Sequence, residues 1–553
     1  MNVQFFRLAC ALAFTIAASL HAADPVVVKW GRFEQSFESG ARYENPLQDA
    51  ALNVAFVSPS GETSRVPGFW DGGKTWRVRF SPNQPGQWKW TTTCSDAANK
   101  GLHLQSGSFL CSAPASPKTR FEQHGPVRVA TNQFTLEHED GTPYFWVADT
   151  AWNGALLATP KEWDFYLQTR AAQKFSGVKW VATQWRASPS GDLKGEPAFT
   201  GKEKISVNPE FFRRLDEKAD AVNQAGLLNI PVLLWAIGGR SAEQNPGAFL
   251  PEDQLILLAR HMVARWQANQ VVWILGGDGH YFGSEGEKWR RVGRAVFDGI
   301  SHAPVVMHPQ GRHWVQREFK DEKWTGIIGY QSGHGDSDES LKWLTGGPIT
   351  QDWENAPRHP IINLEPPYEG HLAYNSKQPL SADLVRRTLY WSLLNTPTAG
   401  VSYGGHGVWG WDDGTKPPAD HPGTGIPLPW QKALFLPGAQ QMTNLVTFFS
   451  MIEWNQLRPL PGAVVNNPGN ASPRKYIAAA RSVKGDLTVV YVPEERTVEI
   501  LLASLPPSPE VKWFNPRTGE TSAAVAVITD TTAQFPTPTE GDWILWMQTQ
   551  VKK

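Results

Sequence analysis

Residues Pro360 to Gly370 read PIINLEPPYEG, a short apolar run that stops at Glu365 and is followed at once by two prolines. An apolar run of this length, bounded by prolines, is typical of a buried β-strand. The carboxyl end of such a strand is where α/β folds bind ligands, so a carboxylate there does not belong to the hydrophobic core. The stretch therefore predicts a strand whose last side chain has a chemical role.

Seven further apolar runs resemble this one and alternate with helical patterns from about Gly125 onward. They begin at Tyr144, Gly177, Leu227, Val271, Pro304, Gly326 and Thr398. Parallel strands need long crossover connections, and eight of them close into a sheet whose interior side chains fill. The pattern predicts an α/β fold, a (β/α)8 TIM barrel, over residues 122–453.

The clearest helix between these strands spans Asn208 to Gly226. Asn208 is a good N-cap, Pro209 suits the first helical turn, and Gly226 is a typical C-terminal stop. A second helical pattern runs from Pro251 to Trp266, whereas the short link over residues 311–325 has the weakest helix signal.

Alternation with a period of two residues flanks the barrel on both sides. Trp76, Val78 and Phe80 alternate with polar residues, the segment SPNQPG turns the chain, and the alternation continues from Trp88 to Cys94. This predicts a hairpin within an amino-terminal β-sandwich over residues 24–115. Runs such as DLTVVYV and DWILWMQ, separated by turn sequences, predict a carboxyl-terminal β-sandwich over residues 454–553.

The composition restricts the partners. The chain has 553 residues, 41% of them hydrophobic, which suits two or three filled cores. Its 52 basic and 53 acidic side chains leave a net charge of −1, so we expect neither nucleic acid nor an anionic membrane as a partner. The 26 Trp residues fit carbohydrate binding and aromatic sandwich cores equally well.

The first residues have the pattern of a secretory signal peptide. Arg7 precedes an apolar run from Leu8 to Leu20, and the small residues Ala22 and Ala23 follow. Residues 1–23 are therefore predicted to be cleaved, and the mature chain to be exported to the periplasm or exterior of a bacterial cell. No other apolar run approaches the ~20 residues of a membrane span, so we expect no membrane contact after cleavage. We also expect the mature chain to be a monomer.

Two cysteines, Cys94 and Cys111, remain after removal of this segment. Each alternates in phase with aromatic residues, so both sulfur atoms should point inward. In an oxidising compartment they could form a disulfide between neighbouring strands, and two free buried thiols are the alternative.

Carboxylates are few at the predicted strand ends. The fourth strand, VVWILGGD, ends at Asp278, and the seventh ends at Glu365. These two strands face each other across an eight-stranded barrel, and glycoside hydrolysis needs two carboxyl groups that flank the scissile bond. We therefore interpret Glu365 as the nucleophile and Asp278 as the acid/base residue, with the glycines before Asp278 leaving room for substrate. Either residue alone could instead cap a helix or pair with an arginine, and Glu369 competes with Glu365.

Polar and aromatic residues at other strand ends could bind sugar hydroxyls or stack on sugar faces, and packing or loop support is the alternative for each. The predicted substrate-binding residues are Asp149, Trp152, Gln184, Trp185, His280, Tyr330, Tyr368, His406 and Trp409.

Two other functions compete with this interpretation. His280, His308, His334 and His406 lie near four strand ends, as in a metal-dependent hydrolase, but no paired-His motif follows the first strand and the spacing matches no standard site. We therefore expect neither metal nor cofactor. A barrel that binds carbohydrate without catalysis is the second alternative, and the presence of both carboxylates argues against it.

Several motifs carry a resemblance to a known family. The runs FWVADTAWN, GGDGH, NLEPPYEG and RRTLYWSLLNTPTAGVSYGGHGVWGW resemble the apiosidase-like barrel proteins, which include glycoside hydrolase family 140. The amino-terminal segment is similar to a small sandwich often joined to that barrel, and the ending with WFNPRTGE resembles the family's carboxyl-terminal sandwich, described as collagen-binding.

The resemblance implies retaining, exo-type hydrolysis of side chains of plant cell-wall or related polysaccharides. Asp278 matches the acid/base position of the family and Glu365 the nucleophile position. The leading sandwich is not part of the minimal apiosidase arrangement, so the sugar and the linkage stay open.

Overall fold

The computed structural model describes residues 24–469 and 471–550. The predicted signal peptide, Met1 to Ala23, lies outside the described residues. In the described ranges, none of the helices combines the length and apolarity needed to cross a membrane.

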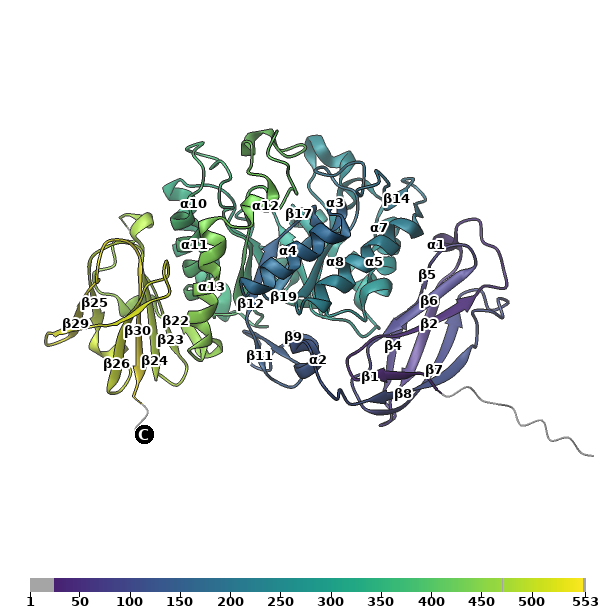
Figure 1. The fold of residues 1–553 in the computed structure, drawn as a ribbon, viewed down its shortest axis with the longest axis horizontal. Coiled ribbons are helices and arrows are strands. Elements are labelled where there is room, and N and C mark those ends of the chain that lie inside the picture. Colours follow the sequence, from purple (N-terminus) through teal and green to yellow (C-terminus); the bar gives the residue numbers. More distant parts are fainter. Residues whose placement is uncertain (1–23, 470, 551–553) are drawn as a thin grey trace, which may run out of the picture.

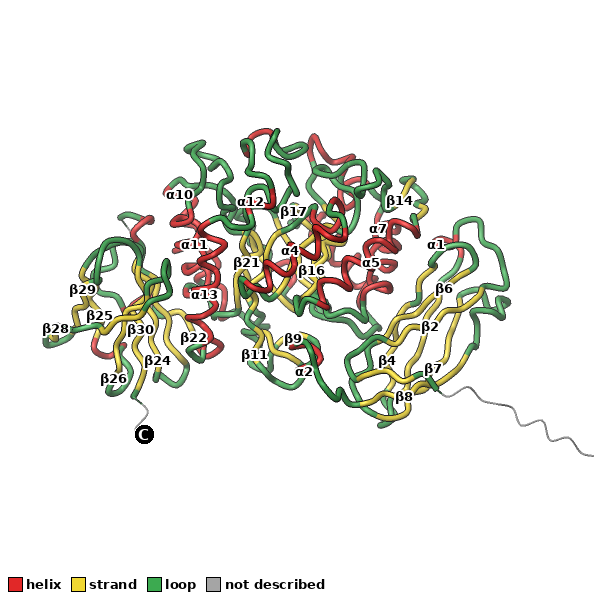
Figure 2. Tube along the Cα trace, in the orientation of Figure 1, coloured by secondary structure: helices red, strands yellow, loops and turns green. Residues whose placement is uncertain are grey.

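Eight parallel strands form a closed barrel at the centre of the molecule (Figures 1 and 2). They are β12 (Trp146–Thr150), β13 (Gly177–Val181), β16 (Leu228–Trp235), β17 (Trp273–Gly279), β18 (Val305–Pro309), β19 (Thr325–Gln331), β20 (Ile361–Glu365) and β21 (Gly400–Tyr403). Each of the eight predicted apolar runs overlaps one of these strands, so the predicted TIM barrel is confirmed.

Helices cover the outside of the barrel (Figure 2). They are α3 (Gly154–Leu157), α4 (Pro160–Ala172), α5 (Pro209–Gln224), α6 (Pro246–Phe249), α7 (Glu252–Trp266), α8 (Gly283–Phe297), α9 (Gln316–Phe319), α10 (Asp338–Gly346), α11 (Ala382–Leu394), α12 (Trp430–Ala433) and α13 (Pro437–Ser450). The side chain of Asn208 accepts hydrogen bonds from the first turn of α5, as predicted. The link with the weakest helix signal contains only the short α9.

A two-sheet sandwich precedes the barrel. One sheet has the order β1-β8-β7-β3-β4 and the other β2-β6-β5. Their bounds are β1 (Val26–Val28), β2 (Phe33–Glu38), β3 (Leu52–Val57), β4 (Thr63–Pro67), β5 (Phe69–Trp70), β6 (Thr75–Phe80), β7 (Gly86–Cys94) and β8 (Ser106–Ser112). The predicted hairpin of β6 and β7 is wrong, because the connecting segment SPNQPG crosses from one sheet to the other. The alternation is nevertheless real, since both strands direct aromatic residues into the shared core.

The predicted disulfide is also wrong. Cys94 and Cys111 are both buried, as expected, but both are free thiols. Cys111 of β8 lies opposite Gly86, the first residue of β7, whereas Cys94 is the last residue of that nine-residue strand. At ~3.3 Å per residue the two cysteines are about 26 Å apart along the sheet, whereas a disulfide requires Cα atoms within about 7 Å.

A second sandwich follows the barrel, with sheet orders β22-β23-β24-β30-β26-β27 and β25-β29-β28. The bounds are β22 (Leu457–Pro459), β23 (Ala478–Ser482), β24 (Leu487–Val492), β25 (Thr497–Leu501), β26 (Pro509–Phe514), β27 (Thr521–Ala523), β28 (Val527–Ile528), β29 (Thr532–Pro536) and β30 (Trp543–Thr549). Trp513 and Trp543 lie in its core, and Trp546 packs edge-on against Phe448 of α13.

The two sandwiches dock on opposite sides of the barrel (Figure 1). On the amino-terminal side, Arg79 of β6 lies 2.9 Å from Asp216 of α5 in a buried ion pair. On the other side, Arg386 of α11 pairs with Asp542 at 2.6 Å. Buried contacts of this kind hold the sandwiches against the helical shell.

Candidate active site

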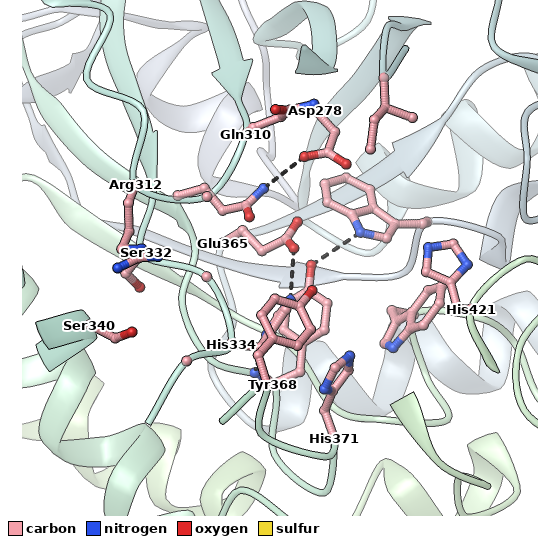
Figure 3. Close-up of a pocket in the computed structure, with 18 of the residues that line it drawn as sticks. Asp278, Gln310, Arg312, Ser332, His334, Ser340, Glu365, Tyr368, His371 and His421 are labelled. Atoms are coloured by element: carbon pink, nitrogen blue, oxygen red, sulfur yellow. Dashed lines mark hydrogen bonds and ion pairs between the residues drawn. The ribbon is translucent and has the colours of Figure 1, made fainter. Parts of the chain in front are cut away.

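A pocket of about 470 Å³ lies at the carboxyl ends of the barrel strands (Figure 3). Each strand or the loop that follows it provides lining residues, among them Trp152, Trp185, Arg186, Trp235, Asp278, Gln310, Gln331, Glu365 and Trp409. Neither sandwich contributes a lining residue. This is the end of the barrel at which TIM-barrel enzymes carry their catalytic groups.

Asp278 reaches the pocket from an irregular strand end. Its φ of 50° is left-handed, a conformation that costs free energy for a residue with a Cβ atom. The neighbouring glycines make room for aromatic rings: a Cβ atom on Gly277 would lie 2.7 Å from Trp235, and one on Gly279 would clash with the ring of Tyr281. The glycines predicted to leave room for substrate are the two before Asp278. Gly277 packs against Trp235, and a Cβ atom on Gly276 would meet Tyr281 at 2.5 Å, so both serve close packing of side chains.

The surroundings of Asp278 favour a retained proton. Its carboxyl Oδ1 accepts a hydrogen bond from Gln331 Nε2 at 3.2 Å, and Oδ2 lies 3.9 Å from the Arg186 guanidinium. Burial, reinforced by the negative charge of Glu365, raises the pKa of Asp278 to about 6, against the opposing effects of Arg186, His308 and Gln331.

Two imidazole groups face the carboxylate of Glu365. His334 Nε2 lies 3.0 Å from Oε1, and His308 Nε2 lies 3.4 Å from Oε2. Backbone N–H groups of Tyr368 and Asp278 donate to Nδ1 of His334 and His308, at 3.2 and 3.4 Å respectively. Since Nδ1 accepts a hydrogen bond in each ring, the ring proton lies on Nε2, which faces Glu365.

The two carboxylates therefore have opposite protonation preferences. Burial alone would raise the pKa of Glu365, but the interactions with His308 and His334 outweigh it and hold this pKa well below the usual value. Near pH 5, Asp278 then carries a proton while Glu365 is ionised. A pair separated in this way can supply one acid and one nucleophile or base.

Tryptophan rings form the wall beside these carboxylates. Trp235 contacts Trp152 and Trp185, with ring centroids 5.4 and 4.4 Å away. The indole Nε1 atoms of Trp235 and Trp409 are buried and have no hydrogen-bond partner among the described residues. Flat apolar faces with a few unpaired donors suit sugars, which present C–H faces edged by hydroxyl groups.

Comparison with known families agrees with this geometry. Residues 130–456, more than half of the chain, match the family described as "Apiosidase-like, catalytic domain". The chain belongs to the apiosidase-like family. Residues 26–95 of this apiosidase-like chain match a domain of unknown function, and residues 460–548 match a family described as "Putative collagen-binding domain of a collagenase".

Solved structures share the fold of this apiosidase-like protein. One, described as a glycoside hydrolase, aligns with a TM-score of 0.69 and 18% identity over 79% of this chain and 100% of its own. A glycoside hydrolase family 5 protein from Bacteroides vulgatus ATCC 8482 aligns with a TM-score of 0.69 and 19% identity over 79% of this chain and 96% of its own.

Another structure from the same organism covers 95% of this chain and 100% of its own, with a TM-score of 0.69 and 18% identity. At these identities the likeness concerns the fold. No curated protein matches the chain. Family membership together with the two carboxylates in the pocket supports a glycoside hydrolase.

Six of the predicted site residues line the pocket together: Asp278, Glu365, Trp152, Trp185, Tyr368 and Trp409. The competing carboxylate, Glu369, does not line it. Its Oε2 accepts a hydrogen bond from Tyr403 at 2.6 Å, and Oε1 accepts one from the backbone of Gly438 in the first turn of α13 at 3.1 Å. Glu369 therefore ties a helix to the barrel, which favours Glu365 as the pocket carboxylate.

Two predicted residues face away from the pocket because they lie on the outer face of their strands. Asp149 accepts hydrogen bonds from Tyr166 and Arg170 of α4 at 2.7 and 2.6 Å. Tyr330 packs against Trp343 of α10, with ring centroids 5.8 Å apart. Both residues contribute to packing between strand and helix.

The other three predicted residues also lie outside the pocket lining. Gln184 supports a loop, since its amide donates to Phe199 O at 3.1 Å and accepts from Ala198 N at 2.9 Å. His280 is exposed. His406 is buried behind the wall, where its Nδ1 donates to the carbonyl oxygen of Gly370 at 3.2 Å.

Several pocket residues escaped sequence-based prediction of substrate contacts. They are Arg186, Trp235, Gln331, His334, His371, Tyr374 and His421, and His308, which does not line the pocket, contacts Glu365 at 3.4 Å. Gln331 could have been found from strand alternation, since it directly follows the outward-facing Tyr330. His308 and His334 were considered only as metal ligands. They face Glu365 instead, and no group of three or more His, Cys, Asp or Glu side chains in the described ranges could hold a metal ion.

Proposed function

We propose that this protein is an exo-acting, retaining glycoside hydrolase that removes sugars from side chains of plant cell-wall or related polysaccharides. Glu365 is the nucleophile and Asp278 the acid/base residue. The observation that carries this proposal is the placement of two carboxylates in one pocket, with surroundings that keep one protonated and the other ionised.

The reaction proceeds in two displacements. Glu365 attacks the anomeric carbon as the glycosidic bond breaks, and Asp278 gives its proton to the departing oxygen. The ionised Asp278 then removes a proton from water, which attacks the same carbon and releases Glu365 as a carboxylate. Both residues return to their starting protonation states.

A contact beside the pocket supports exo action. The loop after β16 and the loop after β21 are joined where Ser241 donates a hydrogen bond to Asp420. Arg186 lies 3.8 Å from the same carboxylate. An endo-acting enzyme needs a groove through which a polymer passes, and we infer that loops joined in this way narrow the approach to the pocket.

We further propose that the apolar segment from Leu8 to Leu20 directs export to the periplasm or exterior of a bacterial cell, and that the mature chain acts as a monomer. Cell fractionation and size-exclusion chromatography with light scattering test these two statements. Retention in the cytoplasm or a defined oligomer would contradict them.

The catalytic assignment is tested with Glu365→Gln and Asp278→Asn. Both variants should fold normally and lose activity by orders of magnitude on whichever member of a panel of pectic and hemicellulosic oligosaccharides the wild type cleaves. Asp413→Asn is the matched control, because Asp413 is an exposed carboxylate after β21 that accepts hydrogen bonds only within its own turn.

The two roles can be separated by adding azide to alanine variants. A glycosyl azide of inverted configuration is expected from Glu365→Ala, and one of retained configuration from Asp278→Ala. Proton NMR of the first wild-type product should show the configuration of the substrate. A wild-type rate in Glu365→Gln, or an inverted product, would contradict the mechanism, and absence of turnover across the panel would favour a non-catalytic carbohydrate-binding barrel.

A further inference from the structure

A lysine side chain lies inside the barrel, below the pocket. Lys179 is on β13, is completely buried, and does not line the pocket. Its Nζ reaches across the barrel interior and donates a hydrogen bond to the carbonyl oxygen of Leu364, the residue that precedes Glu365 on β20.

This ammonium group has little compensation for its loss of water. In the described ranges no carboxylate lies within ion-pair distance of it, and the ring centroid of Trp152 is 4.8 Å from Nζ. The strongest negative charge acting on it is that of Glu365, followed by that of Asp149. Asp149 already pairs with Arg170 on the outside of the barrel, so Glu365 is the carboxylate left to balance Lys179.

A purely structural role does not explain the charge. Methionine or leucine could fill the same interior space, and replacing a buried charge by an apolar group of similar volume is often neutral or stabilising. A buried ammonium directly behind a functional strand end therefore suggests a role in the reaction.

We propose that Lys179 is a positioning residue for the nucleophile: its ammonium group fixes the end of β20 through Leu364 and supplies positive charge that keeps the Glu365 carboxylate ionised. The proposal rests on the proposed function, in which Glu365 must be a carboxylate both before attack and after release of the sugar.

The other groups around Glu365 do not replace the fixed positive charge that Lys179 would supply. His334 Nε2 donates a hydrogen bond to the carboxylate and His308 Nε2 lies 3.4 Å from it, Asp278 faces it across the pocket, and the Tyr368 hydroxyl lies beside it. Burial lowers the pKa of Lys179 to about 7, against the attraction of Glu365 and Asp149. Below pH 6 the lysine is thus charged in the same range in which Asp278 holds its proton.

The charge should also favour the second displacement. When Glu365 leaves the sugar it regains a negative charge, and a nearby cation stabilises that leaving group. Without Lys179, release of the glycosyl enzyme should be slower, so a substrate with an activated leaving group should give a burst of that group followed by a lower steady-state kcat.

The test compares Lys179→Met, which removes donor and charge, with Lys179→Gln, which keeps a donor, and Lys179→Arg, which keeps the charge. In the Met and Gln variants we expect the pKa that defines the acid limb of the kcat/KM–pH profile to increase by about one unit, because Glu365 loses a nearby positive charge. The Arg variant should restore part of the wild-type profile.

Lys218→Met is the matched control. Lys218 is also buried, donates to a backbone carbonyl, that of Ala158 at 2.6 Å, and lies near the ring of Trp163, but it is on α5 away from the pocket. This control should change the melting temperature but not the pKa of the acid limb of the kcat/KM–pH profile.

The outcomes separate this inference from the proposed function. An active Glu365→Gln enzyme would refute both. An inactive Glu365→Gln enzyme, together with Lys179 variants that keep the wild-type acid limb and show no burst, would refute only the role of Lys179. Circular dichroism and a cooperative melt establish that each variant is folded, and Lys179→Gln or Lys179→Arg carries the test if the Met variant does not fold.

Discussion

Arg186 shows how one side chain can affect both catalysis and the shape of the pocket. Its guanidinium lies 3.9 Å from Asp278 and 3.8 Å from Asp420, and its side chain is 18% exposed. A cation at this distance stabilises the ionised form of a carboxyl group. Arg186 therefore limits the rise in the pKa of Asp278 that burial and the charge of Glu365 produce.

Replacing Arg186 by Gln should extend activity to higher pH. Asp278 must be protonated to assist the leaving group, and activity falls as pH rises through its pKa of about 6. Without the cation this pKa should rise, so the basic limb of the kcat/KM–pH profile should move to higher pH by roughly 0.5–1 unit. Arg312→Gln is the control, because Arg312 also lines the pocket and its ion-pair partner is Glu339, at 3.5 Å, and not Asp278. The same basic limb in Arg186→Gln and wild type would contradict this account.

Prediction at the residue scale depended on which face of a strand a side chain occupies. Asp278 and Glu365 were identifiable because they end their strands. Asp149 and Tyr330 lie within strands, where neighbouring side chains point alternately toward the barrel interior and toward the surrounding helices. An error of one residue therefore places a side chain on the wrong face. The hydrogen bonds that orient His308 and His334 could not be predicted, since each joins groups from different strand ends.

At the scale of elements, the end of β17 is the most constrained part of the site. The pairing with β18 shifts register on both sides of Gly277, and the next residue, Asp278, has a left-handed backbone. Irregularities of this kind redirect a side chain at a strand end. Here the left-handed residue is the one whose carboxyl group enters the pocket.

Gly277→Ala should therefore impair both stability and catalysis. The added Cβ would meet Trp235 and Val232 at 2.7 Å, so either a pocket wall or the strand end must move. We expect a loss of about 1–3 kcal/mol in the free energy of unfolding, typical of overpacking, and a lower kcat. Urea unfolding and initial rates measure the two effects. Gly346→Ala, at the end of α10 with open space around its Cα, should be neutral in both.

Element prediction succeeded where local signals were sufficient. Apolar runs bounded by Gly and Pro gave all eight barrel strands, and the Asn208 cap gave the start of α5. The β6–β7 hairpin failed because alternation identifies strands without identifying their partners. A turn-rich connection such as SPNQPG can reverse the chain within a sheet or lead it to the facing sheet.

At the scale of the whole molecule, buried ions join the amino-terminal sandwich to the barrel. Arg79 and Asp71 of the sandwich meet Asp216 and Arg265 of the helical shell, and Arg265 lies 2.6 Å from Asp216 and 3.0 Å from Asp71. These partners are far apart in sequence, so no local pattern could have predicted the junction. Removing one member leaves an unpaired charge in a buried position.

Asp216→Asn should lower the free energy of unfolding by about 3–5 kcal/mol near neutral pH. Burial acts to raise the pKa of Asp216, but Arg265 and Arg79 outweigh it and the pKa is lowered in the folded state. Its contribution is therefore complete above the unfolded value of about 3.9 and is lost as pH falls through the lower folded value. The stabilities of wild type and variant should converge in acid.

Denaturant unfolding across pH tests this expectation, with Asp220→Asn as the control on the same helix. Asp220 pairs with Arg32 of the sandwich, but its side chain is 32% exposed, so its loss should cost about 0–1 kcal/mol. If both variants lost the same free energy of unfolding, burial of the ion pair would not determine how much it stabilises the junction.

The separation of Cys94 and Cys111 has a practical consequence. The amino-terminal sandwich is held by stacked rings, such as Phe33 on Phe109 and Phe56 on Phe80 with centroids 4.2 Å apart, and by no covalent cross-link between its two cysteines. Folding of the described part of the chain therefore calls for no disulfide between these two cysteines. Recombinant production in a reducing cytoplasm, and refolding in the presence of dithiothreitol, should yield the same fold.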